Sequence, residues 1–421
     1  MKANRFVALD SWRGIAALSI VAFHFRTTAG LGDVAIFNGM YLFVDFFFVL
    51  SGFVIYSSYG VKLGSGYSIR RFLWLRFGRV YPLHVAVLFG TITLQALIVY
   101  PRTGHWFPAP TESLDTILAN FFLVHSLNVY NFLTWNEPSW SISVEFFTYI
   151  FFALAVKCGR VFWIFCASAI LAAPAFLFVF NSGKNLDSTA TYGLVRCLYG
   201  FSSGVIAYEL YVGAVKLRAL LQTKPFLSSV TEAVTAIAIG AFIALVGTGP
   251  GSLLAPLLFA VSVIIFAAEA GVISRLLHLQ PLVLLGTISY SLYMVHMLVI
   301  SWWLELFRSA VFKIGGRPLF ESIVDFAQTY VFLAGKNYTG LALMLLMVVI
   351  VSAITYLLIE KPSREWSRRR PYAERTSGGA RMAKATAGHD GLPGADLTPP
   401  PSPAPHPQSP SFGPPQHNRS A

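Results

Sequence analysis

Ten long apolar segments recur along this chain of 421 residues and limit the folds open to it. Each approaches the length of about 20 residues that an α-helix needs to cross the hydrocarbon core of a bilayer. A backbone in lipid must satisfy its own polar groups, which favours helices. The sequence therefore predicts an all-α, polytopic integral membrane protein. The ten segments are residues 6–26, 40–58, 80–100, 140–156, 161–180, 192–212, 226–247, 251–271, 281–303 and 339–360.

Composition agrees with a membrane protein. The chain is 55% hydrophobic and only 12% charged, too little charge to cover the surface of a soluble domain. Its net charge of +12 is interpreted as a membrane bias, in which Lys and Arg gather in cytoplasmic connections, so no nucleic-acid partner is expected. The three cysteines show no metal-ligand spacing, and no metal site is expected.

Lys and Arg residues also predict the orientation. With a cytoplasmic N-terminus, the inner connections hold 18 of them and the outer connections hold 7. We therefore expect both termini inside, a short interfacial or re-entrant helix at 113–127, and a long outer connection at 304–338 that acts as a lid or contacts the acceptor. Residues 1–370 are expected to form one membrane domain. Residues 371–421 hold 11 of the 23 prolines and are expected to be a disordered cytoplasmic tail.

The first segment carries two ionisable groups, Arg13 and His24. Eleven residues make almost three full helical turns, so both side chains share one face, roughly 16 Å apart along the axis. Asp10 precedes Arg13 by three residues and can pair with it. Because ionisable groups are costly inside a membrane, they mark functional sites by default.

Other polar groups sort by depth in this topology. Arg76 and Arg79 fall on the inner side, whereas Asp45, Glu145 and His296 fall in the outer half. Structural alternatives remain open for each group. The two arginines could only anchor their helix at the membrane surface, Asp45 could pair with Arg26, Glu145 could cap its helix, and His296 could be an interfacial hydrogen-bonding residue.

Six sequence elements occur in order along residues 5–365: LDSWRGIAALSIVAFHF, VDFFFVLSGFVI, RFGRVYPLH, PSWSISVEFFTY, ISYSLYMVH and LIEKPSR. Together they resemble the acyltransferase 3 family of integral membrane acyltransferases, the first through its Arg-X10-His signature. The matching positions are Arg13, His24, Arg76, Arg79, Trp140, Ser143, Glu145, Tyr290, Tyr293, His296 and Glu360.

The resemblance implies transfer of an acyl group, commonly acetyl from acetyl-CoA, to a hydroxyl of a carbohydrate or glycolipid such as lipopolysaccharide O-antigen, capsule or exopolysaccharide. It also implies a multi-pass protein of the bacterial inner membrane. The Pro-rich tail stands where some members carry an extracytoplasmic SGNH domain, so this chain is similar to the stand-alone branch. No metal cofactor is implied.

These residues suggest distinct roles in acyl transfer. His24 is the candidate catalytic residue, either as a general base for the acceptor hydroxyl or as a covalent acyl carrier. Glu145 is its candidate carboxylate partner. Arg13, Arg76 and Arg79 are expected to bind the phosphates of CoA. Substrate-contacting residues or donors to the tetrahedral oxyanion are sought among Asp45, Trp140, Ser143, Tyr290, Tyr293 and His296.

Two other function classes are open from the sequence. A secondary transporter or flippase for a sugar-containing lipid would also bury polar groups among ten helices, although no convincing repeat relates the two halves. A membrane scaffold could use the basic, Pro-rich tail, but this leaves Arg13 and His24 unexplained. Transfer of labelled acetyl from acetyl-CoA distinguishes an enzyme from both.

Overall fold

The computed structural model describes residues 5–107, 109, 111–181, 183–314 and 338–369. Within them the chain forms helices and no β-strand, which confirms the all-α class. All these residues belong to one compact unit, Met1–Pro371. The Pro-rich tail and most of the 304–338 connection lie outside the described residues, so their expected roles stay predictions.

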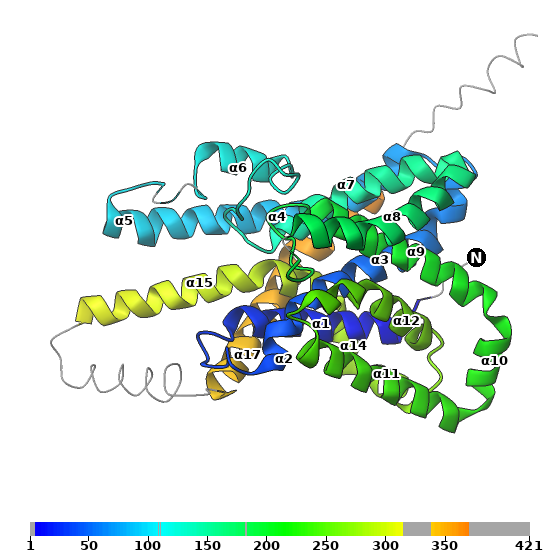
Figure 1. Ribbon diagram of the computed structural model, residues 1–421. Helices are drawn as coiled ribbons and strands as arrows, with labels where there is room; N and C mark the ends of the chain where they lie inside the picture. Colours follow the sequence, from blue (N-terminus) through cyan, green and yellow to red (C-terminus); the bar gives the residue numbers. More distant parts are fainter. Residues whose placement is uncertain (1–4, 108, 110, 182, 315–337, 370–421) are drawn as a thin grey trace, which may run out of the picture. The chain divides into compact units, whose positions relative to one another are not determined.

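Figure 1 shows the helices in chain order. The long ones are α1 (Val7–Phe25), α3 (Phe43–Gly64), α4 (Ile69–Leu94), α7 (Ser139–Ala155), α8 (Arg160–Phe180), α9 (Gly193–Gly213), α11 (Pro225–Leu245), α12 (Ala255–Ala267), α15 (Ser289–Ile314) and α17 (Tyr338–Thr355). The short ones are α2 (Ala35–Gly39), α5 (Tyr100–Thr103), α6 (Leu114–Phe121), α10 (Val215–Thr223), α13 (Val272–Leu277), α14 (Gln280–Thr287) and α18 (Lys361–Arg369). Two π-helical turns, Gln95–Val99 and Tyr356–Glu360, continue α4 and α17.

Each of the ten predicted segments overlaps a helix of the structure, and segment 281–303 overlaps two, α14 and α15. The short helix α6 occupies part of the predicted short helix at 113–127. In the described part, seven helices are long and apolar enough to cross a membrane, or eight if the bent pair α14 and α15 forms one span. Two expected spans fall outside this set. They are α1, with Asp10, Arg13 and His24, and α9, with Arg196 and Glu209. The count of ten spans stays a prediction.

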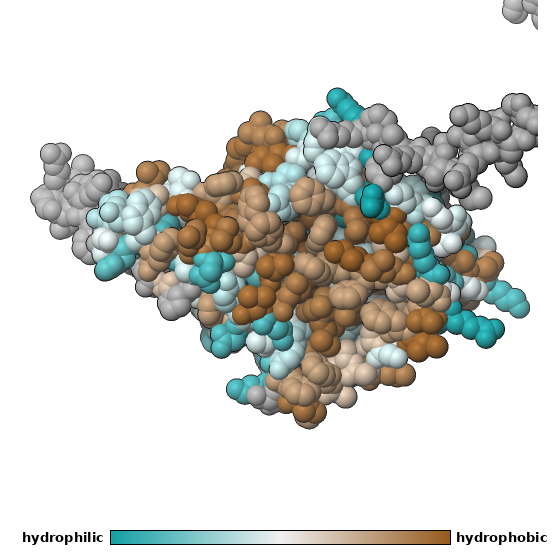
Figure 2. Space-filling view, turned by 90° about the horizontal axis from the view of Figure 1, so that it is seen from above, coloured by the Kyte–Doolittle hydropathy of each residue, from teal (hydrophilic) through white to brown (hydrophobic). Residues whose placement is uncertain are grey.

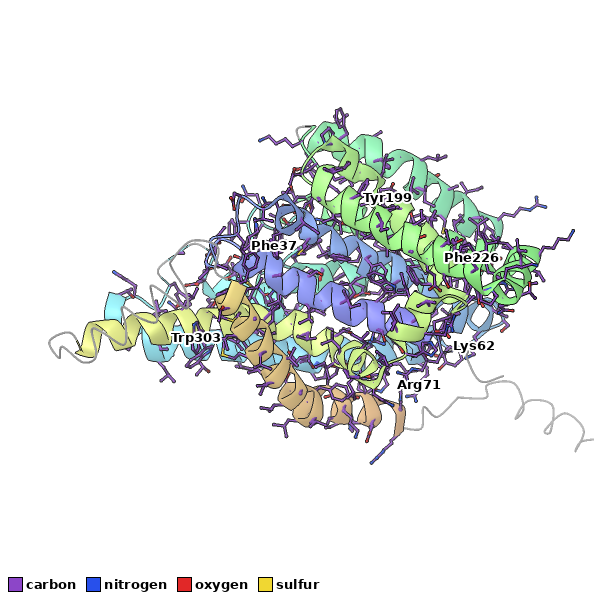
Figure 3. All side chains as sticks on the ribbon, turned by 90° about the horizontal axis from the view of Figure 1, so that it is seen from below. Phe37, Lys62, Arg71, Tyr199, Phe226 and Trp303 are labelled. Carbon is purple, nitrogen blue, oxygen red and sulfur yellow. The ribbon has the colours of Figure 1, made fainter. Side chains whose placement is uncertain are left out.

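Large apolar side chains are exposed on the outer faces of these helices. Phe226 and Leu245 on α11 and Leu171 on α8 are among the most exposed. Hydrophobic residues cover much of the face in Figure 2, and hydrophilic ones gather toward its edges. Figure 3 shows Lys62 and Arg71 near each other at one end, with Phe37 toward the other end. An apolar surface with polar ends is what a bilayer requires.

The closest helix pair is α3 and α9, which run side by side (Figure 1). Glycines permit this approach. A Cβ at Gly204 would lie 1.9 Å from the Val49 carbonyl oxygen, and one at Gly52 would lie 2.0 Å from that of Phe201. Small residues at a helix interface let two backbones come together in a membrane, where the hydrophobic effect between helices is weak.

A buried ion pair fixes the same two helices. Arg196 on α9 donates from Nε to Asp45 Oδ1 at 2.9 Å and from its second amino group to Oδ2 at 2.7 Å. Both side chains are fully buried, and Asp187 lies 3.4 Å from the same guanidinium. Removing one partner would leave an uncompensated buried charge, at a cost of about 3–5 kcal/mol. The pair therefore sets the register of α3 against α9.

A break interrupts the predicted segment 281–303. α14 and α15 meet at a bend of 68° next to Ile288. Gly286 lies against α1 so tightly that a Cβ there would come within 2.1 Å of the Asp10 carbonyl oxygen. The bend leaves carbonyl groups at the end of α14 without partners in their own helix. One of them, that of Gly286, is used in the candidate site.

Candidate active site

A cavity between α1, α3, α4, α7 and α15 holds about 760 Å³ of empty space, part of it open to the outside. Three predicted donor-binding residues line it together: Arg13, Arg76 and Arg79. Among the described residues that line it, Glu145 is the one acidic residue, so positive charge predominates there. Such a cavity suits a ligand with several negative charges. The other lining residues include Ser51, Ser141, Tyr149, Ser289, Tyr290 and Tyr293.

Arg13 is held at the break between α14 and α15. Its Nε donates to Ser289 Oγ at 2.9 Å, and one amino group donates to the Gly286 carbonyl oxygen at 3.2 Å. Asp10 lies 3.9 Å away, which confirms the predicted pair. A carbonyl at a helix C-terminus carries partial negative charge and attracts a cation. The break therefore supplies the groups that fix this arginine at the cavity.

Arg76 and Arg79 reach the cavity from the first turns of α4. The Arg76 guanidinium lies 5.4 Å from the Tyr59 ring centre and 5.9 Å from that of Phe72. Its buried Nε has no hydrogen-bond partner in the described structure. A buried donor without a partner is costly and is satisfied when an oxygen-rich ligand enters. The cavity wall thus fits a phosphorylated donor.

Glu145 lies on the cavity wall and not beside His24. Its Oε1 accepts a hydrogen bond from Tyr149 at 2.6 Å, and the Tyr149 hydroxyl lies 3.1 Å from Ser51 Oγ. Both hydrogen-bond contacts that the described residues make to the His24 ring nitrogens involve other groups, the Ile20 carbonyl oxygen and His296. The expected hydrogen bond between Glu145 and His24 is therefore not present in the described part of the chain, and Glu145 faces the arginines instead.

His24 meets a second predicted residue, His296. Nε2 of His296 lies 3.2 Å from Nδ1 of His24, and the ring centres are 4.8 Å apart. His24 Nδ1 also lies 3.0 Å from the Ile20 carbonyl oxygen. His24 is half-buried, whereas His296 is fully buried. Residues 272 positions apart thus form one imidazole pair between α1 and α15.

Tyr293 connects the imidazole pair with the cavity. Its side chain lines the cavity, and its carbonyl oxygen lies 2.7 Å from His296 Nδ1. The Tyr293 hydroxyl donates to the Pro138 carbonyl oxygen at 3.1 Å and accepts from Ser141 Oγ at 2.8 Å. The turn of α15 from Tyr293 to His296 therefore contacts both the cationic cavity, through the Tyr293 side chain, and the histidine pair, through the Tyr293 carbonyl group.

Of the remaining predicted site residues, one lines the cavity and the others pack or form hydrogen bonds outside it. Tyr290 lines the cavity, and its hydroxyl donates to the Val80 carbonyl oxygen. Ser143 donates to the Leu123 carbonyl oxygen at 2.5 Å, and the Trp140 ring centre lies 5.3 Å from the Arg196 guanidinium. Ser143, Trp140 and Asp45 do not line the cavity, and Asp45 is occupied by Arg196.

Arg26 is not the partner of Asp45. Its Nε donates to Asn38 Oδ1 at 2.8 Å, outside the buried ion pair. Arg196 was not among the predicted site residues, although a charged residue inside a predicted span at 192–212 is itself a signal of a functional or structural site. Ser289 and Tyr149 were not among them either, although they lie inside the sequence elements ISYSLYMVH and PSWSISVEFFTY. No group of three or more potential metal ligands occurs among the described residues.

A family model for an acyltransferase domain, that of acyltransferase 3, matches residues 6–360, nearly all of the membrane unit. The chain belongs to the acyltransferase 3 family. The earlier resemblance is thereby confirmed, and acyl transfer is the class of chemistry that this family membership supports. No solved structure was found to match the chain.

Three curated proteins are similar to parts of the chain. "Protein 2 in picA locus" of Rhizobium radiobacter is 46% identical over 86 residues, covering 20% of this chain and 43% of that protein. "Acyltransferase MdmB" of Streptomyces mycarofaciens is 28% identical over 186 residues, covering 40% and 45%. "Putative peptidoglycan O-acetyltransferase YrhL" of Bacillus subtilis (strain 168) is 24% identical over 388 residues, covering 86% and 55%. The chain spans about half the length of these relatives.

Proposed function

We propose that this protein is a membrane O-acyltransferase that moves an acetyl group from acetyl-CoA to a hydroxyl of a carbohydrate or glycolipid. Family membership supports acyl transfer, and one relative is named as a peptidoglycan O-acetyltransferase. A cell-surface polysaccharide such as O-antigen, capsule or exopolysaccharide is the proposed acceptor class. The proposed location is the bacterial inner membrane, with the donor entering from the cytoplasm.

The observation that carries this proposal is the position of three arginines in one cavity whose wall residue Tyr293 contacts an imidazole pair, His24 and His296, that lies behind the lining. Guanidinium groups bind phosphate oxygens through planar, bidentate hydrogen bonds. CoA carries several phosphates at one end and its thioester at the other. The axial separation of roughly 16 Å from Arg13 to His24 is comparable to an extended pantetheine arm. Arginines and histidines can therefore act on opposite ends of one donor.

The reaction then needs a proton acceptor near the thioester. As the acceptor oxygen attacks the thioester carbonyl carbon, its proton moves to the His24 imidazole. The tetrahedral intermediate collapses, the carbon–sulfur bond breaks, and the thiolate of CoA takes the proton back from His24. The products are the O-acetyl ester and free CoA. General-base assistance of this kind typically contributes 10² to 10⁴-fold.

The test is transfer of radiolabelled acetyl from acetyl-CoA by purified membranes that contain the protein. His24→Ala is expected to abolish transfer, because the alanine side chain has no group that can take the proton from the acceptor hydroxyl. His105→Ala is the matched control, since His105 is exposed and distant in sequence from the site, and it should keep normal transfer. Both variants should be present in membranes in equal amounts.

Near-normal transfer by the His24→Ala variant would remove His24 from the mechanism. A transporter or flippase would label no acceptor with either protein. Comparison of glycan mass spectra from cells with and without the gene then identifies the acceptor, because loss of one acetyl increment reports donor and acceptor class together.

A further inference from the structure

The contacts of the imidazole pair define which ring atoms carry hydrogen. His296 Nδ1 lies 2.7 Å from the Tyr293 carbonyl oxygen. A carbonyl oxygen only accepts, so His296 Nδ1 must donate, and Nε2 of the neutral ring holds the lone pair. This lone pair faces His24 Nδ1 at 3.2 Å. The direction of the hydrogen bond between the two rings follows from this assignment.

His24 must then donate from Nδ1. Its two neighbours are the Nε2 lone pair of His296 and the Ile20 carbonyl oxygen, which are both acceptors. A bare Nδ1 would face two lone pairs and gain no hydrogen bond. The neutral His24 ring is therefore the Nδ1–H tautomer, and its lone pair lies on Nε2. Neither contact made by the described residues involves that Nε2.

We propose that His296 is a positioning residue that holds His24 in the Nδ1–H tautomer, so that His24 reacts through Nε2. This proposal rests on the proposed function. It assigns to His296 the part that a carboxylate plays in a catalytic triad, to orient the imidazole and fix its tautomer. Glu145, which faces the arginines, has a separate role. The same atom of His24 acts whether it removes a proton or carries the acyl group.

The hydrogen bond between His24 and His296 also becomes stronger during the reaction. When Nε2 of His24 takes the acceptor proton, the ring becomes cationic and its Nδ1–H becomes a stronger donor. The hydrogen bond to His296 then joins a charged donor to a neutral acceptor, which is stronger than the bond between two neutral rings. His296 thus stabilises the protonated state of His24 more than its neutral state. Only such differential stabilisation raises kcat.

The backbone anchors make this arrangement rigid. His296 is fully buried on α15, and its bond to the Tyr293 carbonyl holds the ring within its own helix. His24 Nδ1 lies 3.0 Å from the Ile20 carbonyl oxygen of α1 and 3.2 Å from His296 Nε2, so these two acceptors share its one hydrogen. Each ring is therefore fixed to its helix, and the contact between α1 and α15 sets the distance between them.

Two substitutions of His296 distinguish a role in positioning His24 from a role in helix packing. A Gln side chain places its amide oxygen near the site of Nε2 and can accept from His24 Nδ1–H. An Asn side chain places its amide near the site of Nδ1, so it can keep the Tyr293 contact but does not reach His24. The proposal therefore expects His296→Gln to keep kcat within a few-fold of normal and His296→Asn to lose about 10²-fold, the scale of general-base assistance.

The assay measures acetyl transfer from acetyl-CoA, with kcat and KM determined separately and thermal stability measured on the detergent-purified protein. A lower kcat with unchanged KM for acetyl-CoA in His296→Asn, at normal stability, supports the proposal. If the Asn variant is as active as the Gln variant or more active, the proposal is overturned, because packing and the Tyr293 contact then account for His296. If both variants lose activity in proportion to lost stability, the role is structural and the proposal is likewise overturned.

The same variants distinguish failure of the proposed function from failure of the proposed role of His296. Active His24→Ala protein contradicts the proposed function itself. Inactive His24→Ala protein together with fully active His296→Asn protein leaves the acyltransferase in place and removes only the positioning role of His296.

Discussion

At the residue scale, the sequence predicts which polar residues belong to the candidate site. It predicts less well which of these residues contact one another. The prediction that Arg13, Arg76 and Arg79 gather holds, since all three line one cavity. The pairing of Glu145 with His24 does not hold, because helical spacing relates residues within a helix and says nothing of contacts between helices. His296, and not Glu145, is the side chain that contacts His24. This contact depends on the packing of α1 against α15.

A single substitution at Arg76 tests the binding of the acyl donor. Arg76→Ala should raise the apparent KM for acetyl-CoA by about 10-fold or more, because the loss of a charge-assisted hydrogen bond costs about 1.5–3 kcal/mol. Its effect on the acceptor KM should be small. Arg70 is the matched control, since it lies on the same helix α4 but is exposed.

Initial-rate kinetics in purified membranes measure both variants. The alternative role for Arg76 is to anchor its helix at the membrane surface. In that case Arg70→Ala and Arg76→Ala should have the same KM for acetyl-CoA. An unchanged KM for acetyl-CoA in Arg76→Ala would remove this residue from donor binding.

At the element scale, apolar length predicts helices reliably, while their ends and breaks depend on tertiary contacts. The predicted span at 80–100 begins earlier, at Ile69, because the arginine-rich stretch that looks like a connection is helical and turns Arg76 and Arg79 into the cavity. The bend of 68° between α14 and α15 was not predicted. It depends on the approach of Gly286 to α1, which no local pattern records.

The contact between α3 and α9 gives an element-scale prediction. Gly204→Ala should destabilise the protein by at least about 1–3 kcal/mol, the usual cost of overpacking, because its Cβ would lie 1.9 Å from a backbone oxygen that cannot move aside. Gly240→Ala on α11 is the control, because a Cβ there meets no atom within 4 Å. Thermal unfolding of the two purified variants measures the difference. Equal melting temperatures would show that α3 and α9 are less closely packed than described.

At the scale of the whole molecule, the helix directions place the three cavity arginines toward one side. Arg13 lies in the first half of α1, and Arg76 and Arg79 lie in the first half of α4, with the long helix α3 between α1 and α4 in the chain. If successive spans alternate in direction, these three positions share a side. The bias of Lys and Arg among the connections makes that side the cytoplasm. The arginines would then lie on the side of the compartment that contains acetyl-CoA.

Cys158 provides a natural reporter of this orientation. It is exposed in the connection between α7 and α8, whereas Cys166 and Cys197 are buried. We expect a membrane-impermeant maleimide to leave Cys158 unmodified in intact cells and to modify it after permeabilisation. His105→Cys, exposed beyond the end of α5, should be modified in intact cells. The opposite pattern at both positions would put the arginines on the outer side, where CoA is absent, and the donor would then have to be an acyl carrier other than CoA.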